Sequence, residues 1–137
     1  MQIERTDELK NATSEQLAKA VVKILIEKQG IDVRLYDVRD TAAITDFYVI
    51  ATGKSSTHVS SLADDVDYNI ELQGKSAERI EGKRGNSWIL VDYIDVIVNI
   101  FDKESRDFYN FERLMPADGL VDISDIIAEV DKKFDIN

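Results

Sequence analysis

Residues 47 to 74, FYVIATGKSSTHVSSLADDVDYNIELQG, contain the change of pattern that decides the fold. The run Phe47–Thr52 is almost continuously apolar, which predicts a strand buried on both faces, as in sheets that helices cover on both sides. After Gly53 the apolar residues recur at helical spacing until Gly74, which predicts a helix over residues 56 to 73. A buried strand followed by an amphipathic helix indicates an α/β fold.

The segments on both sides of this stretch carry the patterns of further helices and strands. Before it, they predict a helix from Thr13 to Gly30 that opens with the capping-box pair Thr13 and Gln16, then a strand over 33–38 and a connection over 39–45. After it, they predict an edge strand over 77–81 and an antiparallel hairpin of strands 88–91 and 96–101. The last element of this region is a helix over 105–115, which Pro116 terminates. This order predicts a mixed five-stranded sheet flanked by helices, because some neighbouring strands have a helical crossover and others a tight turn.

The two ends of the chain differ from this central region. Residues 1 to 12 lack periodicity and are expected to be flexible, so the domain is predicted to span residues 13 to 116. Residues 117 to 137 form an acidic C-terminal extension, in which a short amphipathic helix is expected. Its apolar stripe consists of Ile123, Ile126, Ile127, Val130 and Phe134.

Composition limits the classes of function. The 137 residues suffice for one domain, and the absence of cysteine excludes disulfides, thiolate metal sites and cysteine nucleophiles. Twenty-seven acidic against 17 basic residues give a net charge of −10, which disfavours direct nucleic-acid binding and suits a basic protein partner. No apolar run approaches the roughly 20 residues of a membrane span, and no secretory leader is recognisable, so a cytoplasmic protein is expected.

Catalytic patterns are weak in this chain. His58 is the sole histidine and has no neighbours at metal-ligand spacing. Gly53-Lys-Ser-Ser56 followed by Asp65 and Asp67 resembles a nucleotidyltransferase pattern, in which two aspartates on a strand hold magnesium. Here both aspartates fall within a helical pattern instead. We therefore predict no enzyme, cofactor or metal, and keep a residual nucleotide-binding or nucleotidyltransferase enzyme as the alternative.

Several motifs together are similar to one known family. They are Ile44-Thr-Asp-Phe-Tyr-Val-Ile-Ala-Thr-Gly53, Ser55-Ser-Thr-His-Val59, Glu81-Gly82, Trp88-Ile-Leu-Val-Asp92, Asp95-Val-Ile-Val98, Ile100-Phe101, and Arg106-Asp-Phe-Tyr109 with Glu112 and Leu114. In this order and spacing they resemble the ribosomal silencing factors, also called the Iojap family. The resemblance runs from about Leu17 to Met115.

This resemblance implies a translation repressor that binds the large ribosomal subunit through its ribosomal protein number fourteen and so blocks joining of the small subunit. It also implies a nucleotidyltransferase-like fold without the catalytic acids, and it allows a homodimer. We expect the ribosome-facing surface where the 88–101 hairpin leads into the next helix, because aromatic and acidic groups meet there. Its residues are predicted to be Trp88, Asp92, Tyr93, Asp95, Arg106, Tyr109 and Glu112.

Two questions stay open at these positions. Trp88 is either a core residue or an exposed binding anchor, because periodicity does not decide between them. The sequence also departs from the family pattern, with Asn99 in place of histidine, Ile94 in place of a turn glycine and Met115 in place of tryptophan. Because isoleucine does not readily adopt a positive φ, the turn at residue 94 is expected to differ from the glycine form.

Overall fold

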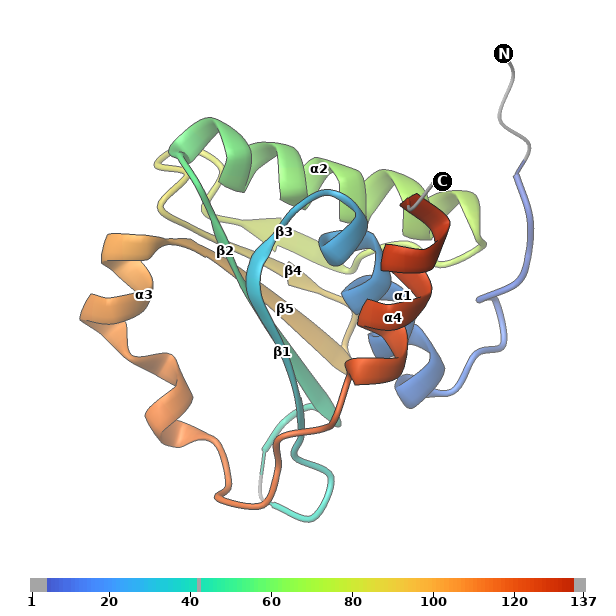
Figure 1. Ribbon diagram of the computed structural model, residues 1–137. Helices are drawn as coiled ribbons and strands as arrows, with labels where there is room; N and C mark the ends of the chain where they lie inside the picture. Colours follow the sequence, from blue (N-terminus) through green and yellow to red (C-terminus); the bar gives the residue numbers. More distant parts are fainter. Residues whose placement is uncertain (1–4, 42, 135–137) are drawn as a thin grey trace.

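A twisted sheet lies at the centre of the fold, with helices on both of its faces (Figure 1). The computed structural model describes residues 5–41 and 43–134. Its elements are α1 (Ser14–Glu27), β1 (Ile31–Asp37), β2 (Phe47–Gly53), α2 (Ser56–Leu72), β3 (Arg79–Glu81), β4 (Trp88–Asp92), β5 (Val96–Asp102), α3 (Lys103–Tyr109), the 3-10 helix η1 (Phe111–Leu114) and α4 (Ser124–Phe134). The predicted α/β class and mixed five-stranded sheet are confirmed. No helix within the described residues is both long and apolar enough to cross a membrane.

The strand order is β1-β2-β5-β4-β3, and all neighbouring pairs except one are antiparallel. The exception is β2 with β5, which run parallel so that Phe47 lies opposite Val96 and Gly53 opposite Asp102. The carboxyl ends of β2 and β5 therefore meet at the same edge of the sheet. The predicted hairpin of β4 and β5 and the short edge strand β3 are both present.

Helices α1 and α2 cover one face of the sheet and form the main core with it. The capping box of Thr13 and Gln16 starts α1 as predicted. Gly53 is required where β2 passes into α2, because a Cβ there would lie 2.7 Å from Val59 Cγ2 and 2.8 Å from Val59 N. A smaller cluster lies on the opposite face, around Ile50 and Phe101.

The segment before α1 packs against the end of α2 where the structure describes it. The amide of Thr6 donates to the Leu72 carbonyl and that of Leu9 to the Gln73 carbonyl, both at 2.7 Å, and the Leu9 side chain is buried. Residues 6 to 12, which the sequence predicted to be flexible, thus make contacts at the end of α2, while residues 1 to 4 lie outside the described part. One buried leucine and two backbone hydrogen bonds hold this segment without producing a periodic pattern.

The helix expected over residues 105 to 115 is two shorter elements. Asn110 adopts a left-handed conformation with φ of 45°, which ends α3 and redirects the chain into η1. Asparagine tolerates this conformation better than most residues. The break turns the two elements independently, so that α3 buries Arg106 instead of an apolar stripe.

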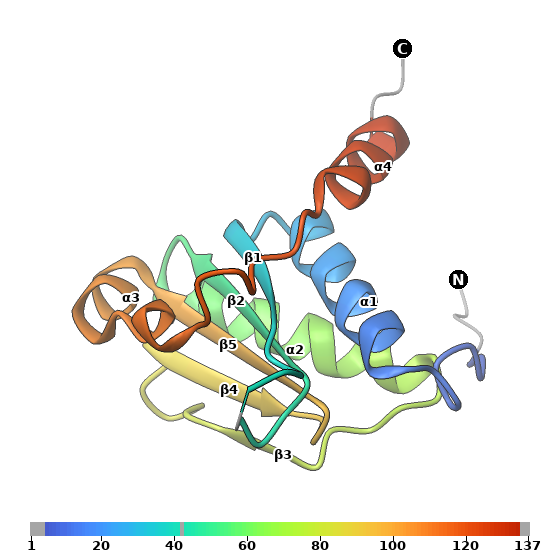
Figure 2. The same ribbon diagram turned by 90° about the horizontal axis from the view of Figure 1, so that it is seen from below.

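The C-terminal extension packs against the domain. Before α4 the chain runs antiparallel along the edge strand β1 (Figure 2), where the Asp37 amide donates to the Gly119 carbonyl and the Val121 amide to the Leu35 carbonyl. The predicted amphipathic helix is α4, which lies against α1 and buries Val130. Ile123 and Ile126 also pack against the core, whereas the Phe134 side chain lies outside the described part.

The turn between β4 and β5 corrects another expectation. Ile94 has φ of 74°, and the Asp95 amide donates to the Tyr93 carbonyl at 2.9 Å, which makes a γ-turn. The isoleucine thus adopts the glycine-like conformation that its β-branch disfavours. Asp92 supports the strained turn by accepting the Ile94 amide through Oδ1 at 2.7 Å.

Replacing Ile94 with glycine is expected to raise the free energy of unfolding by about 1 kcal/mol. The folded protein loses the strain of a positive φ at isoleucine, and this gain exceeds the entropy by which glycine stabilises the unfolded chain. The Ile94 side chain is 58% exposed, so little buried surface is lost. Urea denaturation measures the change. Ile94→Val keeps the β-branch and should show no gain, and a glycine variant less stable than the parent would contradict the strain.

Candidate functional site

Trp88 lies at the start of β4 on the face opposite α1 and α2, where it is half-buried. Its ring packs on Phe101 with centroids 4.9 Å apart and on Tyr109 at 5.0 Å. Its indole Nε1 donates to Asn99 Oδ1 at 2.9 Å, which fixes the ring over the sheet. Trp88 is therefore neither a fully buried core residue nor a fully exposed anchor, because part of its ring is packed and part is accessible.

Apolar side chains on α3 and η1 extend this cluster toward solvent. Phe108 is 78% exposed and meets Tyr109 edge to face, with centroids 5.1 Å apart. Phe111 packs against Tyr48 at 5.2 Å and closes the cluster from the other side, while Leu114 is exposed. We call the four residues Trp88, Phe108, Tyr109 and Leu114 the aromatic surface. Exposed aromatic groups on a packed support are typical of protein-binding sites.

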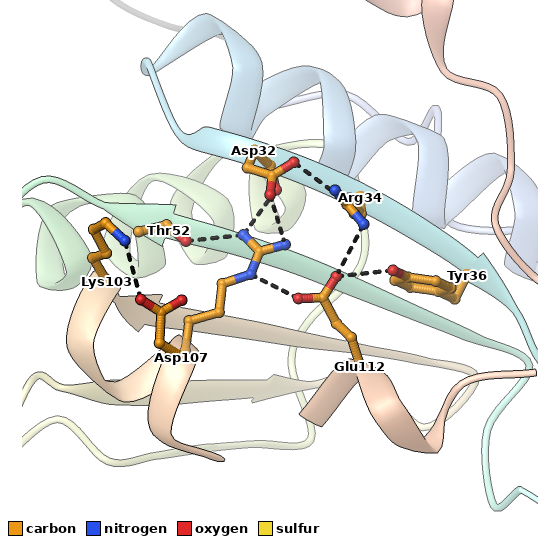
Figure 3. A network of polar contacts seen from close by, with 8 residues as sticks. Asp32, Arg34, Tyr36, Thr52, Lys103, Asp107 and Glu112 are labelled. Atoms are coloured by element: carbon orange, nitrogen blue, oxygen red, sulfur yellow. Dashed lines mark hydrogen bonds and ion pairs between the residues drawn. The ribbon is translucent and has the colours of Figure 1, made fainter. Parts of the chain in front are cut away.

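A buried arginine holds α3 against the sheet (Figure 3). Arg106 Nε donates to Glu112 Oε1 at 2.9 Å, and its Nη1 donates to Thr52 Oγ1 at 2.9 Å and to the Asp32 carbonyl at 2.8 Å. The contacts join α3 to β1, β2 and η1, so they fix the orientation from which α3 presents its aromatic residues. Arg106 was predicted to lie on the ribosome-facing surface, whereas it is only 8% exposed.

Glu112 joins the same network to β1. Its Oε2 accepts the Tyr36 hydroxyl at 2.8 Å and lies 3.6 Å from Arg34 Nη1. Burial alone would raise the pKa of the Glu112 carboxyl, but the hydrogen bonds from Arg106 and Tyr36 and the neighbouring positive charges outweigh it and hold that pKa below its usual range. Glu112 therefore stays ionised and linked to its partners.

The remaining predicted site residues lie apart from this group. Asp92 is buried, where it accepts from Arg79 Nε at 3.2 Å and from the turn amide. Tyr93 is buried in the main core on the helix-covered face, and burial followed by the charges of Asp67 and Glu71 raises the pKa of its phenol. Asp95 is exposed, but it lies at the opposite end of β5 from the strand position that pairs with Trp88.

The sequence matches the family described as "Ribosomal silencing factor during starvation" over residues 11–135. The chain belongs to the ribosomal silencing factor family. A silencing factor of Zymomonas mobilis is 34% identical over 108 residues, which cover 77% of this chain and 81% of the relative. The chloroplastic Iojap protein of Zea mays is 32% identical over 95 residues, covering 69% and 41%, respectively. A mouse protein named for mitochondrial assembly of the ribosomal large subunit is 25% identical, covering 69% and 42%.

Solved structures show the same fold. A crystal structure of a Chromobacterium violaceum protein superimposes with a TM-score of 0.72 at 27% identity, over 74% of this chain and 85% of that one. A crystal structure from Bacillus halodurans gives 0.65 at 30% identity, over 79% and 95%. The silencing factor fold therefore extends over most of this chain, in agreement with the resemblance inferred from its motifs.

Two departures of this chain from the family pattern have clear structural roles. Asn99 is buried and accepts the Trp88 indole hydrogen, so the side chain that replaces histidine still makes a hydrogen bond. Met115 packs against the smaller core cluster beside Phe111. Phe108 and Leu114 were not among the predicted site residues, because the sequence predicted one continuous helix over residues 105 to 115 and gave no sign of the break at Asn110.

The two aspartates of the nucleotidyltransferase-like pattern are not on a strand, where such an enzyme would hold magnesium. Asp65 and Asp67 lie in α2 as predicted, and no group of three or more His, Cys, Asp or Glu side chains that could hold a metal ion is found within residues 5–41 and 43–134. His58 has a structural role, because its Nδ1 accepts the Lys54 amide at 2.8 Å and its Nε2 lies 3.1 Å from the Lys28 carbonyl oxygen. It thereby connects the start of α2 to the end of α1.

Proposed function

We propose that this silencing factor is a non-enzymatic translation repressor that binds the large ribosomal subunit in the cytoplasm and prevents the small subunit from joining. Family membership carries the proposal, because the relatives are named as ribosomal silencing factors and the mouse relative is named for assembly of the large subunit. Inhibition then needs no chemistry, since a protein bound on the subunit interface excludes the other subunit by its volume.

The aromatic surface is the proposed contact with the ribosome. It offers one rigid, half-buried tryptophan surrounded by more exposed apolar groups, an arrangement typical of binding hot spots. The proposed partner is ribosomal protein number fourteen, a basic protein that the net charge of −10 would attract. The exposed carboxylate of Glu104 lies one helical turn before Phe108 on α3 and would border this surface.

The seven predicted site residues take different parts in this proposal. Trp88 and Tyr109 contact the partner directly, whereas Arg106 and Glu112 position α3 and η1 behind them. Asp95 is exposed and would add charge at a distance. Asp92 and Tyr93, which are buried, act only by supporting the turn.

Phe108→Ala is expected to weaken large-subunit binding by roughly 2 kcal/mol, about thirtyfold in Kd, because it removes an exposed aromatic anchor. Co-sedimentation with purified large subunits measures the binding. The melting temperature should stay nearly unchanged, because the Phe108 side chain is largely exposed. Tyr68→Ala, which removes a 52% exposed aromatic residue from α2, is the matched control and should bind normally. Equal binding by both variants, or equal loss, would contradict the proposed surface.

A lysate experiment tests the proposal as a whole. The immobilised chain should recover large subunits without small ones, and recovery of both together would exclude the repressor mechanism. The same aromatic surface could instead join two copies of the chain, as the resemblance allows. Sedimentation of the free protein at micromolar concentration distinguishes a monomer from such a homodimer.

A further inference from the structure

A cavity of about 550 Å³ opens at the carboxyl ends of β2 and β5, and none of the four residues of the aromatic surface lines it. Its volume lies in the range of sites that bind small molecules. Its charged lining residues are Asp32, Arg34, Lys54, Lys103, Arg106, Asp107 and Glu112, and the others are Ile31, Thr52, Gly53 and Asn110. The proposed function uses only the Arg106 and Glu112 pair, and only as a support for α3.

The topology places this cavity where open α/β sheets bind ligands. β2 and β5 are adjacent and parallel, but the helices that follow them leave to opposite faces of the sheet. α2 packs with α1 on one face, and α3 lies on the other. Such a divergence opens a crevice beyond the carboxyl ends of the two strands. The Gly53-Lys-Ser-Ser56 motif noted in the sequence begins at this crevice.

The lining is more cationic than the protein as a whole. Four cations face three carboxylates in the cavity, whereas the chain carries a net charge of −10. Lys103 pairs with Asp107 at 3.0 Å in an exposed position that solvent weakens. The Lys54 ammonium is exposed and has no hydrogen bond or ion pair to any described residue. At least one cation of the cavity is therefore available to an incoming anion.

The Asp32 carboxylate lies between the guanidinium groups of Arg34 and Arg106 in the lining of the cavity (Figure 3). It accepts Arg34 Nε at 3.0 Å and lies 3.5 Å from Arg106 Nη2, a buried group that donates no hydrogen bond. Asp32 itself is half exposed and has φ of 48° at an irregularity of β1. A half-exposed carboxylate that bridges two guanidinium groups, one of them only through a 3.5 Å contact, can be replaced by an anion with better geometry.

We infer that this cavity binds a small phosphorylated ligand of about mononucleotide size. Its phosphate oxygens replace the Asp32 carboxylate at Arg34 and Arg106 and also reach Lys54 and Lys103. Several cations around one point suit a phosphate group, which carries more charge and more acceptor oxygens than a carboxylate. Ile31 offers an apolar contact to the organic part of the ligand. This inference does not depend on ribosome binding.

Titration of the ¹⁵N-labelled full chain with adenosine diphosphate tests the inference. Saturable shifts are expected at the amides of Gly53, Lys54 and Asn110, and inorganic pyrophosphate should reverse them by competing for the same cations. Shifts that do not saturate at millimolar ligand, or that arise mainly at lysines outside the cavity, would overturn it.

Two variants with opposite expected effects make the test specific. Lys54→Ala should weaken binding roughly tenfold by removing a charge-assisted hydrogen bond. Asp32→Asn should tighten binding several-fold, because it removes the competing carboxylate while asparagine tolerates the positive φ. Lys132→Ala removes an exposed cation of α4 outside the cavity and should have no effect. An unchanged or weakened Asp32→Asn variant, or an equal loss in Lys132→Ala, would contradict the site.

Discussion

Replacing Arg106 with methionine is expected to lower the free energy of unfolding by about 3 kcal/mol, because it removes a buried guanidinium that pairs with Glu112 and donates to two further oxygens. Glu112 would lose the 2.9 Å bond to Arg106 Nε while remaining mostly buried. Thr52 and the Asp32 carbonyl would also lose their donor. Arg106 is the only buried residue of α3, so nothing apolar in that helix compensates.

Urea denaturation of the parent, Arg106→Met and Arg113→Met measures this effect. Arg113 is exposed and makes only long contacts to nearby carbonyls, so its variant should stay within about 0.5 kcal/mol of the parent. A loss in Arg106→Met no larger than that in Arg113→Met would contradict the structural role of the network.

The pH dependence gives a second readout of the same variant. The pKa of Glu112 is lowered in the folded protein, so its ionisation contributes stability that is complete above the ordinary glutamate pKa. This contribution disappears as the pH falls through that value toward the lower folded pKa. The difference in stability between the parent and Arg106→Met should therefore shrink from neutral pH to about pH 3.

Trp88→Ala is expected to lower the free energy of unfolding by about 3 kcal/mol, because it opens a cavity against Phe101 and Tyr109. It also leaves the buried Asn99 Oδ1 without its donor, and Asn99 Nδ2 already has no partner among the described residues. The half-buried position makes this loss smaller than that of a fully enclosed tryptophan.

Measuring binding by the Trp88 variants shows whether Trp88 contacts the large subunit directly or only stabilises the fold of the surface around it. Trp88→Phe retains aromatic packing and should cost only about 1 kcal/mol for the lost hydrogen bond. Thermal denaturation and large-subunit co-sedimentation are measured on both variants. If the folded fraction of Trp88→Ala binds large subunits normally, then Trp88 is not part of the contact.

Sequence patterns predicted those elements whose burial comes from side-chain periodicity. The strand at Phe47–Thr52 and the helix that follows it were predicted because each has an apolar pattern of the right period. The helix predicted over residues 105 to 115 includes most of α3, but its end at Asn110 and its orientation were not predicted, because a polar network, and not an apolar stripe, determines which side of that helix faces the sheet. Its single buried residue, Arg106, has the composition of a surface residue and depends on partners from three other elements.

The candidate site was predicted only in part for the same reason. Trp88 and Tyr109 are brought together by β4 and α3, as their order in the chain suggested. Tyr93 lies on the opposite face of the sheet from Trp88, because side chains alternate between the two faces along a strand. The prediction placed both residues on one surface and did not take this alternation into account. Asp32 contacts Arg106, and Arg34 contacts Glu112. Because these partners are more than 70 positions apart, no local sequence pattern predicts the contacts.

The pairing of the C-terminal extension with β1 bears on how the protein behaves at high concentration. An open sheet offers unpaired amides and carbonyls at each edge, where strands of other molecules can add and build insoluble polymers. Here residues 119 to 121 occupy part of one edge, and the irregularity at Asp32 distorts the rest. The other edge, β3, is three residues long and carries Arg79 and Glu81. The extension thus protects the chain from intermolecular strand addition while leaving the aromatic surface uncovered.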